Sequence, residues 1–246
     1  MDPYQSPDNQ SDMVVEAMVG RLEDRGEDER FNGFIDRYLS KVDVSEKGLV
    51  VDVGCGTGVV TRRLASRLPG SVRITGVDIS ERLLEVARPT ADKRTEYVLA
   101  DADSMPLPDG CAELVVMHTL ISHVPDPAAI LREGGRLLAP GGQLVVFDAD
   151  YASTTYAIGD FEKGCRIDRK LLGAVVHNLD VCRRMPRIIK QAGLELSGHE
   201  GHVISEAGEG DFWLSSVRGF EKLIPALGIL PEAEGCAWVE EMIGSH

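Results

Sequence analysis

The sequence predicts an α/β protein built on a doubly wound, mostly parallel sheet. Between residues 48 and 150, short β-branched runs alternate with helical segments of about 10 to 15 residues, the pattern of right-handed βαβ units. Glycines and aspartates follow the ends of these runs, where parallel sheets bind ligands. The chain has 246 residues, 43% of them hydrophobic and 27% charged, which suits one large α/β unit with a sizeable core.

The first 47 residues are expected to form a helical cap. Residues 1–10 are polar and offer nothing to bury, so we expect them to be disordered. Apolar residues recur at three- and four-residue spacing over residues 13–22 and 31–39, which predicts two amphipathic helices. The charged stretch 24–30 between them predicts a loop.

Residues 48–150 are expected to form the ligand-binding core. Strands are expected over residues 48–53, 72–78, 95–100, 113–118 and 143–148, because each is a short apolar run. Helical periodicity follows the first strand over residues 57–68. Ser80 is a natural N-cap for a second helix, and Pro127 occupies a favoured first-turn position of a third, which runs to about Ala139.

Residues 151–246 are expected to supply lid helices, the last strand or strands, and C-terminal helices. Helices are predicted over residues 161–176, 181–192, 212–227 and 232–243, and a strand near 194–205.

Charge and composition exclude several classes of protein. The formal net charge of −14 opposes a phosphate backbone, so no nucleic-acid partner is expected. No apolar run reaches the ~20 residues of a membrane helix, and no signal peptide is present, which predicts a cytoplasmic protein without a membrane span. The five cysteines and six histidines show no metal-binding spacing, so we expect reduced, mostly buried thiols and no metal.

The loop after the first strand indicates one type of ligand. Asp52 precedes a run that contains Gly54, Cys55, Gly56 and Gly58, and glycines let a ligand approach the backbone closely. Dinucleotide sites usually need G-x-G-x-x-G, whereas this loop reads G-x-G-x-G. A preceding carboxylate suits a ligand that carries an ammonium and a sulfonium. The loop therefore favours S-adenosylmethionine over NAD or a flavin.

The next two strand ends extend the predicted site. Asp78 closes the second strand, where a carboxylate can accept hydrogen bonds from both hydroxyls of a ribose. Asp101 follows the third strand beside Ala102 and is suited to an adenine amino group. A solvent-facing Asp78 and a turn-capping Asp101 are the alternatives.

Five segments in order resemble the successive motifs of class I S-adenosylmethionine-dependent methyltransferases, above all the ubiquinone/menaquinone-biosynthesis branch. They are Val51–Gly58, Gly76–Ser80, Asp101–Asp109, His123–Pro127 and Leu138–Gly142. The resemblance covers about residues 48–150 and implies a Rossmann-like methyltransferase fold. It places the loop glycines along the methionine portion of the cofactor, Asp78 at the ribose, and Asp101 with Ala102 at the adenine. Cys55 and Ile79 belong to the same motifs.

The resemblance also implies roles after the fourth and fifth strands. His118 would lie near the sulfonium, either contacting the cofactor or acting as a general base, since imidazole titrates near neutrality. His123 is expected to serve packing or helix entry, and Asp150 is predicted to face the substrate. The motif by which methyltransferases acting on nucleic-acid amino groups resemble one another, N/D/S-P-P-aromatic, is absent.

Similarity to this fold also predicts an antiparallel seventh strand, but no clear β-branched run follows Ser205. That strand is therefore expected to be missing or shortened to residues 201–205. An uncovered sheet edge would result, and a homodimer would shield it.

The predicted activity is in-line transfer of a methyl group to oxygen, carbon or nitrogen of a small organic molecule. A lid over the acceptor is expected from residues 13–40 and 151–192. Its apolar wall would include Phe31, Phe34, Tyr38, Tyr151, Tyr156, Phe161 and Leu172. Two alternatives remain at this point: a protein that binds S-adenosylmethionine without methylating, and a protein or RNA methyltransferase.

Overall fold

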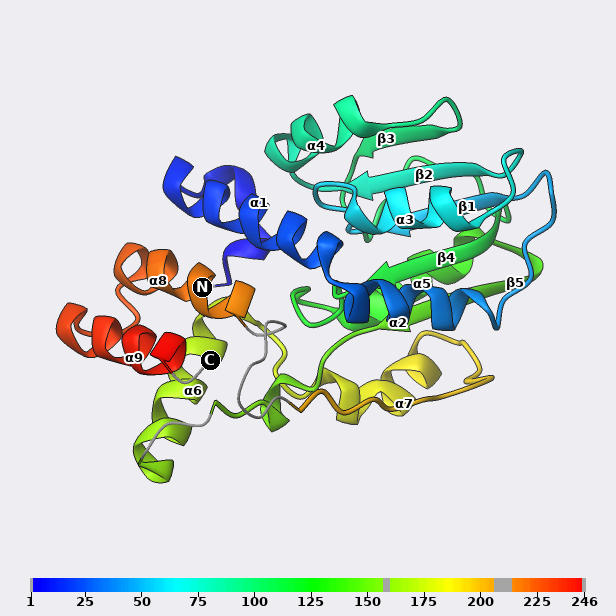
Figure 1. The fold of residues 1–246 in the computed structure, drawn as a ribbon. Helices are drawn as coiled ribbons and strands as arrows, with labels where there is room; N and C mark the ends of the chain where they lie inside the picture. The colour runs from blue at the N-terminus through cyan, green and yellow to red at the C-terminus, as the bar shows by residue number, and fades with distance from the viewer. Residues whose placement is uncertain (1, 157–159, 206–213, 245–246) are drawn as a thin grey trace.

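A five-stranded, entirely parallel sheet forms the centre of the computed structural model, which describes residues 2–156, 160–205 and 214–244 (Figure 1). The strand order is β3-β2-β1-β4-β5. The strands are β1 (Leu49–Val53), β2 (Arg73–Asp78), β3 (Thr95–Leu99), β4 (Ala112–His118) and β5 (Leu138–Phe147). The predicted doubly wound α/β fold is confirmed.

Helices precede, connect and follow the strands. The α-helices are α1 (Asp12–Glu27), α2 (Glu29–Leu39), α3 (Val59–Arg67), α4 (Glu81–Ala87), α5 (Pro127–Leu137), α6 (Phe161–Val175), α7 (Val181–Gln191), α8 (Leu214–Leu227) and α9 (Glu232–Gly244). Short 3₁₀ turns are η1 (Pro3–Gln5), η2 (Pro7–Asn9), η3 (Arg88–Thr90) and η4 (Tyr151–Ser153). The helices predicted near residues 161–176, 181–192 and 232–243 are confirmed. The helix predicted over residues 212–227 is confirmed by α8 from residue 214 onward.

Both faces of the sheet are covered by helices. On one face α2 and α3 pack against the strands, in a cluster that includes Ile35 and Val116. On the other face α5 and α7 pack against the alternate residues, including Leu131 and Met117. Val116 and Met117 are neighbours on β4 and therefore point to opposite faces. β1 is buried along its whole length, as expected for a parallel strand with helices on both sides.

A second group of helices packs beside the sheet. Figure 1 shows α1 lying between the sheet and a lobe made of α6, α8 and α9. Val14 and Met18 of α1 belong to the core of this lobe, together with Phe220 of α8 and Trp238 of α9. The rings of Phe220 and Trp238 meet edge to face with centroids 5.7 Å apart. One face of α1 is thus fixed to the lobe.

The prediction that the N-terminus is disordered is wrong for residues 2–10. The Asp2 carboxylate accepts hydrogen bonds from the backbone N–H groups of Tyr4 and His177, both at 2.9 Å, and lies 2.8 Å from Nδ1 of His123. The Asp8 carboxylate accepts hydrogen bonds at the start of α4. Polar composition does not prevent order here because the acidic side chains find donors on the folded core.

The loop predicted over residues 24–30 is also wrong. α1 continues to Glu27 and α2 begins at Glu29, so a single residue separates the two helices. That residue, Asp28, accepts a hydrogen bond from the N–H of Phe31 at 2.8 Å and caps α2. Charged residues between two apolar segments were consistent with a loop, but here they lie in the last turn of α1 and the first turn of α2, where Asp24, Glu27 and Glu29 are exposed.

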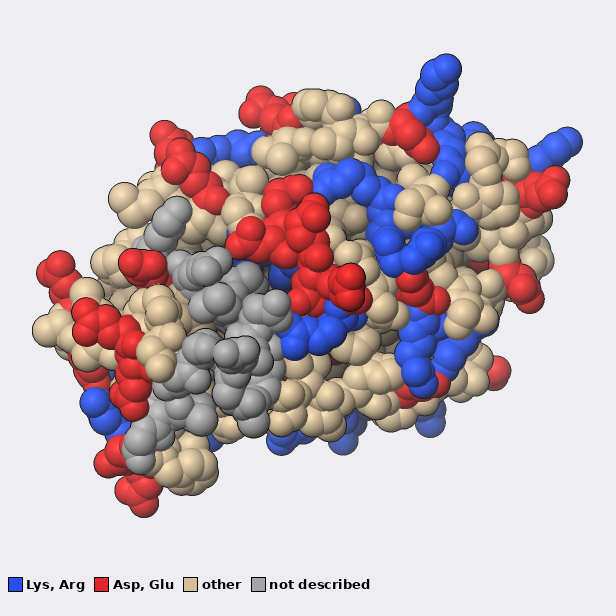
Figure 2. All heavy atoms as spheres, in the orientation of Figure 1, with Lys and Arg blue, Asp and Glu red and all other residues tan. Residues whose placement is uncertain are grey.

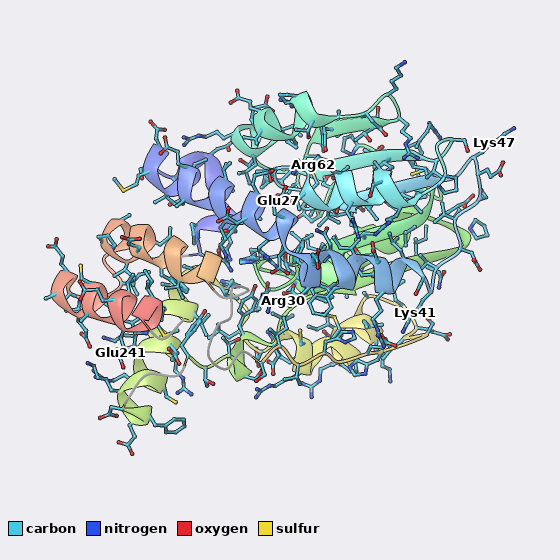
Figure 3. The ribbon with its side chains drawn as sticks, in the orientation of Figure 1. Glu27, Arg30, Lys41, Lys47, Arg62 and Glu241 are labelled. Atoms are coloured by element: carbon cyan, nitrogen blue, oxygen red, sulfur yellow. The ribbon has the colours of Figure 1, made fainter. Side chains whose placement is uncertain are left out.

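Three further predictions need correction. No strand is found among the described residues after Phe147, so the strand predicted near 194–205 is wrong, whereas β5 begins at Leu138 rather than 143. The segment 194–205 instead contacts α2, where Glu200 pairs with Arg37 at 2.8 Å. Glu200 also pairs with Lys41, which lies just after α2 (Figure 3). Of the five free cysteines only Cys55 is fully buried.

Candidate functional site

The loop between β1 and α3 is built for close approach to its backbone. Gly54, Gly56 and Gly58 have φ values of 73°, 54° and 81°, in the left-handed region that side chains rarely allow. The N–H groups of Gly54 and Cys55 both donate to the carbonyl of Val77, at 2.7 and 3.0 Å. A Cβ on Gly54 would lie 2.7 Å from Leu120 Cδ1. These positions therefore require glycine.

Asp78 fastens this loop to the next strand end. Its carboxylate accepts hydrogen bonds from the N–H groups of Gly56, at 2.7 Å, and Ser80, at 2.9 Å. Asp78 is buried, and this burial raises the pKa of its carboxyl. Two N–H donors occupy part of its capacity, and the remaining lone pairs are available to a ligand in the adjoining cavity.

Asp52 was predicted to contact the ligand, but it lies beneath the loop and does not line the cavity. Its side chain is 1% exposed and accepts a hydrogen bond from Thr61 Oγ1 at 2.6 Å. Burial raises the pKa of Asp52 to about 7, and the nearby charge of Asp78 adds to this shift. Gly58 does not line the cavity either, and serves as the N-cap of α3.

A cavity of about 400 Å³ opens above the carboxyl ends of the strands. Seven of the predicted cofactor residues line it together with His118: these seven are Gly54, Cys55, Gly56, Asp78, Ile79, Asp101 and Ala102. The structure thus brings together side chains from four successive strand ends, as the sequence predicted. Their contacts with a cofactor remain a prediction.

His118 closes β4 at the floor of this cavity. Its Nδ1 lies 3.3 Å from the Tyr38 hydroxyl, and its ring packs against Phe31 and Phe147 at centroid distances of 4.7 and 4.4 Å. Burial holds the pKa of His118 well below its ordinary value, so the imidazole is neutral. The next residue, Thr119, has φ 55°, a strained conformation for a residue with a side chain.

A covering element was missed in the sequence. Tyr4, Gln5, Ser6 and Pro7 line the cavity, so residues 2–10, here called the N-terminal strap, cover it. The strap is tied at one end by Asp2 and at the other by Asp8. The available signals were the two prolines, each at the start of a 3₁₀ turn, and Asp2 as N-cap of the first.

We expect Asp8→Ala to loosen the strap and weaken S-adenosylhomocysteine binding. Asp8 accepts hydrogen bonds from the Ser80 hydroxyl and from the N–H groups of Glu81, at 3.0 Å, and Arg82, at 3.3 Å. Loss of hydrogen bonds to the start of a helix costs about 1 kcal/mol. Because the ligand is held under the strap, the same energy lowers its affinity by up to roughly fivefold.

Calorimetry measures this affinity directly. Asp12→Ala is the matched control, because the Asp12 side chain is 91% exposed and pairs only with Arg82 at the surface among the described residues. Equal affinities for the two variants would contradict a role for Asp8 in holding the strap over the ligand.

Two of the seven residues predicted to form the apolar wall of a lid line the cavity. Phe31 and Tyr151 line the cavity, whereas Phe161 is 76% exposed and Leu172 lies in the core of the helical lobe. The remaining predicted wall residues, Phe34, Tyr38 and Tyr156, do not line the cavity.

Asp150, predicted to face the substrate, is not brought to the cavity. Its Oδ2 pairs with Arg183 of α7 at 3.0 Å, and Asp150 is not among the residues that line the cavity. The geometry therefore does not bring Asp150 and His118 together as a substrate-facing pair.

The polar groups that line the cavity suit S-adenosylmethionine. Among the described residues, Thr57 Oγ1 and His118 Nε2 are buried without a hydrogen-bond partner, and both residues line the cavity. Buried polar atoms are normally paired, so a polar ligand is expected to complete them. The bare backbone at Gly54 and Gly56 leaves room for its methionine portion, and the acidic Asp78 and Asp101 suit its hydroxyl and amino groups.

Comparisons with known proteins agree with this site. The family model described as "Methyltransferase domain" matches residues 51–146. The methyltransferase GfsG of Streptomyces halstedii is 29% identical over 168 residues, covering 65% of this chain and 58% of that protein. A ubiquinone/menaquinone biosynthesis C-methyltransferase of Geotalea daltonii is 31% identical over 115 residues, covering 45% and 49%. The chain thus spans about half the length of these curated relatives.

A solved structure shares the fold. The chain resembles an S-adenosylmethionine-dependent methyltransferase from Aquifex aeolicus with a TM-score of 0.55 at 18% identity, covering 71% of this chain and 87% of that one. The glycine loop and Asp78 occupy the strand ends that the motif order assigned to them. Residues 51–146 are therefore similar to a methyltransferase domain, and the chain has the fold of the Aquifex aeolicus methyltransferase.

Proposed function

We propose that the protein transfers the methyl group of S-adenosylmethionine to a small organic molecule by in-line displacement. The observation that carries this proposal is the cavity, which continues from the strand ends to Phe31, His118 and Tyr151 and is covered by the N-terminal strap. An acceptor there would be enclosed together with the cofactor. Small-molecule sites have this concave, largely apolar form.

The protein contributes positioning and exclusion of water. The bound cofactor supplies the electrophilic methyl group. The glycine loop and Asp78 hold the cofactor, and Phe31 and Tyr151 keep water from the reacting atoms. In the tautomer whose Nδ1–H donates to the Tyr38 hydroxyl, Nε2 of neutral His118 has no partner among the described residues and can accept a hydrogen bond from the attacking group.

The surface supports a small acceptor over a macromolecular one. Figure 2 shows basic side chains gathered over α2 and α3 with acidic ones among and beside them, and the formal net charge of −14 opposes binding of an RNA backbone. None of the described helices is both long and apolar enough to cross a membrane.

Label transfer tests the proposal. The protein is incubated with methyl-radiolabelled S-adenosylmethionine and a cell extract, which is then separated into small-molecule, protein and RNA fractions. We expect label in the small-molecule fraction, and none there with Asp78→Ala. Label in protein or RNA would contradict a small acceptor. Cofactor binding without any label transfer would favour a non-methylating role.

A further inference from the structure

Helix α1 places two arginines in the wall of the cavity. Arg21 and Arg25 both line it, and residues four apart lie on the same face of a helix. Burial lowers the pKa of Arg25, and the neighbouring charge of Arg21 contributes in the same direction. Two like charges this close disfavour each other, so the arrangement needs a compensating anion.

Neither arginine has a carboxylate partner within the described chain. Arg62, by contrast, pairs with Glu23 of α1 at 2.7 Å, at the junction of α3 and α1 (Figure 3), and Arg63 pairs with Asp36 at 2.6 Å. The guanidinium of Arg25 lies 4.4 Å from the centre of the Phe31 ring. Nε of Arg21 is buried with no hydrogen-bond partner among the described residues.

The surroundings of Arg21 are aromatic rather than acidic. Burial opposes the charge of Arg21, but the nearby Tyr4, Tyr151 and Tyr156, together with a hydrogen bond to Tyr4, raise the pKa of the guanidinium. Tyr4 and Tyr151 line the same cavity. Arg21 therefore places a positive charge beside aromatic side chains that carry hydroxyl groups.

The nearby carboxylates are already used by other donors. Asp148, which lies close enough to Arg25 to favour its charge, accepts hydrogen bonds from the N–H groups of Ser122, at 2.8 Å, and Ala149, at 2.9 Å. Asp2 is occupied by His123, at 2.8 Å, and by the N–H of His177. Among the described residues, neither guanidinium is paired with a carboxylate, which favours a ligand as the source of the counter-charge.

The cofactor can supply only one such charge. S-adenosylmethionine carries one carboxylate, together with a sulfonium and an ammonium. The turn of α1 that holds Arg25 packs on the glycine loop, since Leu22 Cδ1 lies 3.3 Å from a Cβ position on Gly56 and Val59 Cγ1 lies 2.8 Å from one on Gly26. Arg25 stacks on the Phe31 ring, whereas Nε of Arg21 has no hydrogen-bond partner among the described residues, so Arg21 is the arginine left for a second anion.

We propose that Arg21 binds a carboxylate group of the methyl acceptor, so that the substrate is a small, anionic molecule whose apolar part lies against Tyr4 and Tyr151. A guanidinium presents a planar pair of donors that matches a carboxylate. This inference rests on the proposed function, because it assigns the acceptor half of the same cavity.

Calorimetry on the full chain loaded with S-adenosylhomocysteine tests the inference. The probes are para-hydroxybenzoate and its uncharged analogue para-hydroxybenzamide. We expect the wild type to bind the carboxylate and not the amide, and Arg21→Gln to weaken carboxylate binding by about 10- to 100-fold. Arg67→Gln, an exposed arginine on α3, is the matched control and should bind like the wild type.

Two parallel measurements separate the explanations. Arg21→Gln should bind S-adenosylhomocysteine with nearly wild-type affinity, and the ligand-free Arg21→Met variant should melt no lower than the wild type, because an unpaired buried charge has been removed. If Arg21→Gln weakens the binding of S-adenosylhomocysteine and of para-hydroxybenzoate equally, Arg21 belongs to the cofactor site and the inference is overturned. A lowered melting temperature for Arg21→Met, or no carboxylate binding by the loaded wild type, would also overturn it.

Failure of the proposed function gives a different result. A wild type that does not bind S-adenosylhomocysteine, or that transfers no label, contradicts methyl transfer. The carboxylate titration repeated without S-adenosylhomocysteine still reports on Arg21 in that case, since it compares the charged and uncharged probes directly. Equal binding of the two probes would overturn the anion assignment.

Discussion

Asp78→Ala is expected to weaken S-adenosylhomocysteine binding by about 3 kcal/mol, or roughly 100-fold. The variant would lose the proposed acceptor for the ribose hydroxyls. It would also leave the N–H groups of Gly56 and Ser80 buried without their present partner. Because these two donors belong to the glycine loop and to the start of α4, both segments would be held less firmly beside the cavity. Isothermal calorimetry measures the change.

The control for this variant is Asp43→Ala, because Asp43 is an exposed aspartate ahead of β1. Asp78→Asn should give an intermediate loss, since its amide oxygen can still accept one N–H while its amide nitrogen cannot accept any. Wild-type affinity in a folded Asp78→Ala protein would remove Asp78 from the ligand site.

The largest expected effect on stability comes from Asp52. Its pKa is about 7 in the folded protein against an ordinary value of 3.8, chiefly because the carboxyl is buried. Between these values the folded protein holds a proton that the unfolded chain releases. The free energy of unfolding therefore falls as pH rises from about 4 to 7, by up to about 4 kcal/mol from this group.

Urea unfolding at a series of pH values tests this expectation. Asp52→Asn cannot ionise, and its amide oxygen can still accept the Thr61 hydroxyl, so its stability should fall less over this range than that of the wild type. The comparison between variants matters because Asp78 and Asp148 have raised pKa values that act in the same direction. Parallel curves for wild type and Asp52→Asn would contradict a buried, protonated Asp52.

The parts of the site that could be predicted are local in sequence. The glycine loop and Asp78 each follow directly from a strand, and a strand end in a parallel sheet already fixes the place of the next few residues. Asp52 is two residues before Gly54 and was therefore assigned to the ligand. Its actual position beneath the loop follows from strand pleating, because alternate side chains on β1 point to opposite sides.

The parts that could not be predicted depend on distant contacts. Asp2 reaches His177, 175 residues away, and Asp8 reaches Ser80, 72 residues away, so no local pattern could reveal the strap. Asp150 turns to Arg183 only because α7 packs beside it. The inward position of Arg21 likewise depends on the helical lobe, which takes the apolar face of α1 and leaves its arginines toward the cavity.

The N-terminal strap has a consequence for the timing of catalysis. Because residues 2–10 are held at both ends and residues 4–7 line the cavity, we expect the two carboxylate anchors to slow the release of a nucleotide-sized product. Opening of such a segment limits turnover in enzymes where it is slower than the chemical step. Asp2 is also nearly inaccessible, with 4% exposure, so an affinity tag fused directly ahead of it would press on the anchor and change the exchange rate being measured.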